Sequence, residues 1–141
     1  MLKQLSIYVE NKKGRMQHIT GLLVENEINI LGSMTNDGIE FGIIRMVVSD
    51  PEKAEKAVKD AGYLCCLTDV LGIEMDDEVG SLHKVLLALS DSNINVDYSY
   101  LSFNRETGTP IMVIYAEDIY EVENCMESKG FVSVSNISRK L

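Results

Sequence analysis

One segment of the chain has the residue types that hold a small anion, namely three cations, an amide and a glycine: Glu10-Asn11-Lys12-Lys13-Gly14-Arg15-Met16. Alternating apolar residues over 5–9 predict a strand before it, and the apolar spacing over 16–23 predicts a helix after it. The segment is therefore expected at a helix entrance, where backbone N–H groups lack partners and carry partial positive charge. An amino-acid carboxylate fits there, because Gly14 allows a close approach. A structural role stays open, in which Asn11 caps the helix and Gly14 eases a turn.

The same pattern occurs about 66 positions later, in Asp76-Asp77-Glu78-Val79-Gly80-Ser81. At this shift, Ile28-Asn29 falls on Ile94-Asn95. Further along, the shift becomes about 68, and Gly62 falls on Gly130. The extra residues belong to a hairpin turn of the second copy, and such an insertion leaves the packed elements unchanged. The chain therefore contains two copies of one unit.

Each copy is expected to fold in the order strand, helix, strand, strand, helix, strand. In the first copy, Asn36-Asp37-Gly38 signals a hairpin, Pro51 opens the second helix, and a short buried strand is expected over 63–67. Right-handed crossovers fold this βαββαβ order into an antiparallel sheet with both helices on one face. The predicted fold class is α+β, with two ferredoxin-like units.

The two predicted domains are residues 1–68 and 69–141, with almost no linker between them. Because residues 67–70 lead from one strand directly into the next, we expect the domains to pack together. A pseudo-twofold axis should relate the copies and bring both glycine loops near the shared boundary. Two independent domains on a flexible hinge would contradict this expectation.

The composition excludes several classes of partner. The formal net charge is −9, whereas nucleic-acid binding needs a basic face. No apolar stretch reaches the ~20 residues that span a bilayer, and the N-terminus lacks the pattern of a secretory signal. We therefore expect a cytoplasmic protein that binds neither nucleic acid nor a membrane.

The cysteines and histidines are not grouped for metal binding or catalysis. Cys65 and Cys66 are neighbours in a predicted strand and point to opposite faces, which suits core filling better than chelation. Cys125 stands alone, and His18 and His83 are expected on helix surfaces. Neither copy has a nucleophile beside a base or a glycine run that would cradle phosphate. We expect no catalytic residue, no metal and no cofactor.

Each copy has an Asn/Asp-x-x-Gly loop after its first predicted strand and Ile-Asn before its second. With these features, the two βαββαβ units resemble a tandem pair of ACT domains. The first loop is similar to the family pattern Glu-Asn-Arg-Pro-Gly-Val-Leu, although Lys13 and Val79 stand where the family has proline. ACT domains are regulatory modules that bind amino acids where the glycine loop of one domain faces the second strand of its partner. The resemblance implies a non-catalytic sensor with its ligand at the interface between the two domains.

In the serine-sensing members of this family, the loop asparagine and the asparagine that opens the second strand contact the amino acid. The resemblance carries these roles to Asn11 and Asn29 in the first copy, and to Asp77 and Asn95 in the second. The complete set of candidate ligand-binding residues is Asn11, Lys12, Lys13, Gly14, Arg15, Met16, Asn29, Met34, Asp77, Val79, Gly80, Ser81, Leu82, Asn95, Tyr98 and Tyr100.

The two loops differ in charge, because the first holds cations and the second holds carboxylates over 76–78. We expect the ligand carboxylate at the first loop, with Asn95, Tyr98 and Tyr100 opposite it. The acidic residues of the second loop could instead stabilise their helix, and the two tyrosines, which share a face, could serve only sheet packing.

Substitution of the glycine in each loop should reveal which loop binds the ligand carboxylate. Gly14→Val is expected to block binding, with little loss of folding if Gly14 has a negative φ. Gly80→Val is expected to matter much less.

The leading function is a sensor that changes its assembly or partner contacts when a free amino acid or similar small zwitterion binds. A homodimer or higher homo-oligomer through the ACT sheets is expected. The alternatives are an interaction module that pairs through sheet edges without a ligand, and a small enzyme on a ferredoxin-like fold. Saturable amino-acid binding without turnover would separate the sensor from both.

Overall fold

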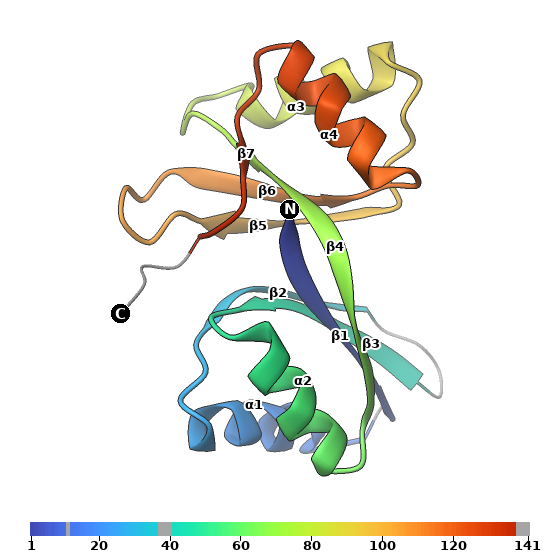
Figure 1. Ribbon diagram of the computed structural model, residues 1–141, viewed down its shortest axis with the longest axis vertical. Helices are drawn as coiled ribbons and strands as arrows, with labels where there is room; N and C mark the ends of the chain where they lie inside the picture. Colours follow the sequence, from blue (N-terminus) through green and yellow to red (C-terminus); the bar gives the residue numbers. More distant parts are fainter. Residues whose placement is uncertain (11, 37–40, 138–141) are drawn as a thin grey trace. The chain divides into compact units, whose positions relative to one another are not determined.

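The computed structural model describes residues 1–10, 12–36 and 41–137. The chain divides into two compact units (Figure 1). The N-terminal unit is Lys3–Thr68, and the C-terminal unit is Met1–Leu2 with Asp69–Leu141. The first two residues thus group with the C-terminal unit, whereas the sequence placed them in the first domain.

The N-terminal unit has the predicted order of elements. They are β1 (Leu2–Glu10), α1 (Arg15–Glu25), β2 (Ile30–Asn36), β3 (Phe41–Val48), α2 (Pro51–Asp60) and the first part of β4 (Leu64–Glu74). The strands lie in the order β2-β3-β1-β4, and β3 pairs antiparallel with both β1 and β2. Of the predicted hairpin signal, residues 37 and 38 lie outside the described residues.

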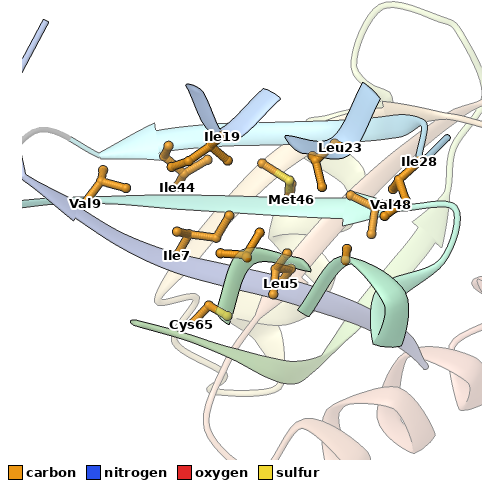
Figure 2. Packing of buried hydrophobic residues seen from close by; sticks show 12 residues of the cluster. Leu5, Ile7, Val9, Ile19, Leu23, Ile28, Ile44, Met46, Val48 and Cys65 are labelled. Carbon is orange, nitrogen blue, oxygen red and sulfur yellow. The ribbon is translucent and has the colours of Figure 1, made fainter. Parts of the chain in front are cut away.

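One face of this sheet packs against helix α1 (Figure 2). Alternate residues of a strand point to the same face, so Leu5 and Ile7 of β1 join Ile44 of β3 in one buried cluster. Ile19 and Leu23, four residues apart on α1, belong to the same cluster. Burial of each such side chain contributes about 1.5–3 kcal/mol. The sheet and helix therefore hold the first loop between two rigid elements.

The C-terminal unit repeats this arrangement. It consists of the second part of β4, α3 (Ser81–Asp91), β5 (Tyr98–Phe103), β6 (Pro110–Tyr115), α4 (Ile119–Ser128) and β7 (Ser133–Val134). Its strand order is β5-β6-β4-β7, with antiparallel pairs. Its core contains Ile73 and Ile114 together with Val85 and Leu89 of α3. Two ferredoxin-like βαββαβ units, as predicted from the sequence, are confirmed.

Strand β4 differs from the short buried strand that was predicted over 63–67. It continues without a break from Leu64 to Glu74. Cys65 is buried, whereas Leu64 and Cys66 are exposed. In the N-terminal unit, β4 lies at the end of the strand order, and only one of its faces meets the core.

The helices do not all begin in the same way. As predicted, Pro51 opens α2, and the Asp50 carboxylate caps it by accepting a hydrogen bond from the backbone N–H of Lys53 at 3.2 Å. Helices α1 and α3 instead have glycine at the N-cap position. None of the helices formed by the described residues is both long enough and apolar enough to cross a membrane.

Candidate ligand site at the first glycine loop

The loop between β1 and α1 leaves the start of α1 without a side-chain cap among the described residues. Gly14 is the N-cap residue, with φ 85° and ψ −1°, and its carbonyl oxygen accepts a hydrogen bond from the backbone N–H of His18 at 3.0 Å. Asn11, a ligand candidate and the cap in the alternative structural interpretation, lies outside the described residues. The left-handed φ of Gly14 contradicts the negative φ on which the mild folding effect of Gly14→Val depended, because a side chain is strained in this region.

A hollow of about 300 Å³ lies beside this loop, at the ends of β2 and β3. Its volume suits a small ligand. It brings together Lys12, Arg15 and Met16 from the predicted set. The complete lining is Val9, Glu10, Lys12, Arg15, Met16, Thr35, Asn36 and Gly42.

Charges of both signs line the hollow. Glu10 Oε2 lies 2.7 Å from Lys12 Nζ and 3.8 Å from Arg15 Nη2. The hydrogen bond from Lys12, together with the positive charge of that residue, holds the pKa of Glu10 below its ordinary value. These side chains are largely exposed to solvent, so their pairing adds little to stability. The hollow therefore offers an anionic and a cationic partner side by side.

The sequence did not predict that residues of β2 and β3 form one wall of the hollow. Thr35 Oγ1 lies 3.8 Å from Met16 Sδ, which connects the end of β2 to the first turn of α1. A Cβ at Gly42 would lie 2.8 Å from the carbonyl oxygen of Asn36, so this position has no room for a side chain. The pairing of Val9 with Gly42 depends on the strand register. The only local sequence signal for this wall was Gly42, a glycine within a predicted strand.

Two candidates of the first copy lie away from the hollow. Because α1 runs back along the sheet, β2 begins at the end opposite the loop. There the N–H of Asn29 donates to Ser49 Oγ at 2.9 Å, and its carbonyl accepts from the N–H of Ser49 at 2.9 Å. Met34 is half-buried opposite Arg45. Lys13 is exposed beside the loop.

The second loop has the same backbone but different surroundings. Gly80 is the N-cap residue of α3, with φ 92° and ψ −4°. The acidic residues precede this N-cap residue, and none of them lies in the first turn of α3; their support of the helix stays a prediction. Ser81 lines a different hollow, together with Asp76. The remaining candidates of this loop are exposed: Asp77, Val79 and Leu82.

The candidates in β5 and in the segment before it make contacts within their own unit. Asn95 is exposed and lines a hollow of about 420 Å³ with Asp118. Tyr98 stacks on Tyr115, with ring centroids 5.2 Å apart, and Tyr100 is only 7% exposed. These contacts favour the sheet-packing interpretation of the tyrosines. Their expected place opposite the first loop, and the pseudo-twofold relation of the copies, stay predictions.

No cluster of three or more His, Cys, Asp or Glu side chains among the described residues could hold a metal ion. Burial raises the pKa of the Cys65 thiol, which keeps it protonated and unreactive. Of Cys65 and Cys66, which were both predicted to fill the core, only Cys65 is buried, and Cys66 is exposed. Cys125 is half-buried. His18 and His83 are on helix surfaces, as predicted.

Comparison with known proteins agrees with this architecture. A family model described as an ACT domain pair matches residues 1–137. The crystal structure of a protein from Bacteroides thetaiotaomicron is similar with a TM-score of 0.87 and 33% identity, over 99% of this chain and 96% of that one. No match was found among curated protein sequences.

Two more distant structures share the fold. The regulatory subunit of aspartate kinase from Thermus thermophilus, in a ligand-free form, has a TM-score of 0.64 and 13% identity, over 89% of this chain and 91% of that one. The corresponding subunit from Thermus flavus has a TM-score of 0.61 and 15% identity, over 89% and 90%. The resemblance found in the sequence is confirmed: the chain belongs to the ACT domain family, as a pair of ACT domains.

Proposed function

We propose that this ACT domain pair is a non-catalytic regulatory protein that binds a free amino acid, or a similar small zwitterion, in the hollow beside Gly14. One observation carries the proposal: the start of α1, which no side chain of the described residues caps, adjoins a hollow with both a carboxylate and cations. An amino acid needs partners of both signs. A simple anion that drew Lys12 away from Glu10 would leave that carboxylate unpaired and would be repelled by it.

The charges suggest how the ligand is held. Its carboxylate would accept hydrogen bonds from the first N–H groups of α1 and from the guanidinium of Arg15. Its ammonium group would donate to Glu10 in place of Lys12. The Lys12 side chain is 66% exposed, so it can leave Glu10 at small cost.

The fold shared with regulatory subunits of aspartate kinase supports a regulatory role. We propose that the protein acts as a homodimer or higher homo-oligomer through its ACT sheets, and that the ligand shifts this assembly or its contacts with a partner. Sedimentation velocity with and without the bound amino acid measures such a shift.

Isothermal titration calorimetry of the full chain against each free amino acid tests the proposed function. We expect saturable binding of at least one, with the ligand recovered unchanged. Arg15→Gln is expected to weaken that binding about tenfold, because it removes one charge-assisted hydrogen bond worth about 1.4 kcal/mol.

The matched control is Lys56→Gln, which removes the same charge from the exposed surface of α2, where Lys56 pairs with Asp60. It should leave binding unchanged. If no amino acid binds to the folded protein, the sensor function is wrong. If both variants bind equally well, the ligand lies elsewhere.

A further inference from the structure

A second and larger hollow lies on the other side of the first loop. Its volume is about 530 Å³, and it is bounded by the end of β1, the start of β3 and the turn between α2 and β4. The complete lining is Tyr8, Glu10, Arg15, Phe41, Ala61, Gly62, Tyr63 and Leu64. The proposed amino-acid site shares only Glu10 and Arg15 with it.

Large apolar side chains gather around this hollow and remain exposed. Tyr8 is 41%, Phe41 60% and Leu64 71% exposed. One exposed apolar side chain on a protein surface is ordinary, but several around one concavity indicate a binding site. Tyr63 is half-buried and completes the aromatic lining.

Two groups give the hollow a polar end. The hydroxyl of Tyr63 is hydrogen-bonded to Nδ1 of His18, and the two rings lie 5.6 Å apart. Arg15, at the start of α1, projects a guanidinium that is 41% exposed. A guanidinium binds a carboxylate through two parallel hydrogen bonds, which fixes the orientation of the acid group.

The C-terminal unit contains the equivalent hollow, also of about 530 Å³. The repeat places Glu74 where Tyr8 stands, Thr109 where Phe41 stands and Ser81 where Arg15 stands. The concavity is thus common to both copies. The combination of aromatic walls and a guanidinium is present only in the hollow of the N-terminal unit.

The geometry points to a binding site in this hollow for a small carboxylate that carries an aromatic ring. The ring would lie against Tyr8, Phe41 and Leu64, which offer aromatic and aliphatic surface. The carboxylate would accept hydrogen bonds from Arg15, while Lys12, whose Nζ lies 2.7 Å from Glu10 Oε2, offsets the negative charge of Glu10, which also lines this hollow. This site is distinct from the proposed zwitterion site and does not rest on it, since the apolar wall belongs to the second hollow alone.

Calorimetry with 3-phenylpropanoate tests the inference on the full chain. We expect saturable binding, at least tenfold tighter than that of propanoate, which lacks the ring, and of 3-phenylpropanamide, which lacks the charge. Binding of 3-phenylpropanamide as tight as that of the acid would overturn the role of Arg15. No saturation of the acid below about 10 mM would overturn the site.

Phe41→Ser and Leu64→Ser locate the site, because both side chains are exposed and their loss leaves no cavity in the core. Each is expected to weaken binding of 3-phenylpropanoate at least fivefold. Val132→Ser is the matched control: Val132 is the repeat equivalent of Leu64 and is 56% exposed. Equal affinity in all three variants would place the probe elsewhere. Because Phe41 does not line the smaller hollow, Phe41→Ser also distinguishes failure of this site from failure of the proposed function.

Discussion

Gly14→Val is expected to weaken amino-acid binding about a hundredfold and to lower the free energy of unfolding by about 1–2 kcal/mol. Gly14 has φ 85°, where a β-branched residue is strained. Relief of that strain would move the backbone at the start of α1, and the ligand carboxylate would lose a hydrogen bond to a backbone N–H worth about 1.5–3 kcal/mol. Calorimetry measures the affinity, and urea unfolding followed by circular dichroism measures the stability.

Gly80→Val is the matched control for this substitution. Gly80 has φ 92°, and neither glycine would place a new Cβ within 4 Å of a neighbouring side chain or backbone. The two variants should therefore lose similar stability, while only Gly14→Val loses affinity. Equal losses of affinity, or a loss with Gly80→Val alone, would be inconsistent with a primary site at the first loop.

Ile73→Ala is expected to lower the free energy of unfolding by about 2–5 kcal/mol. Ile73 is fully buried in β4 and pairs with Met112 of β6. Truncation removes apolar contacts and leaves a cavity that the surrounding strands can only partly fill. Its repeat equivalent Ile7 is equally buried in the core of the N-terminal unit, so Ile7→Ala should cost a similar amount.

Val79→Ala is the control for these core substitutions, since Val79 is fully exposed in the second loop. It should change the free energy of unfolding by no more than about 0.5 kcal/mol. Urea denaturation of all three variants gives the comparison. A cost below about 1 kcal/mol for Ile73→Ala would mean that this core is not close-packed.

Local patterns were sufficient to predict the architecture. Alternation in 5–9 and helical spacing in 16–23 depend only on neighbouring residues, and the repeat supplied each assignment twice. Pro51 and Gly62 marked the ends of α2 for the same reason. The extent of β4 was underestimated, because nothing local separates one long strand from two strands joined end to end.

The candidate site was predicted only in part. Lys12, Arg15 and Met16 lie at the first hollow, because they surround a helix start that the sequence already indicated. The left-handed conformation of Gly14 was not predicted, since glycine adopts either sign of φ with similar ease. Asn11 lies outside the described residues.

The sequence by itself determined the two copies, the order of their elements and the difference in charge between the two glycine loops. Only the tertiary structure decided that Thr35 and Gly42 complete the first hollow, and that Tyr8 meets Phe41 and Leu64 at the second. Periodicity and turn signals depend only on residues that are close together in the sequence. The meeting of distant residues depends on strand register and on where each crossover returns the chain, and no short stretch of sequence contains that information.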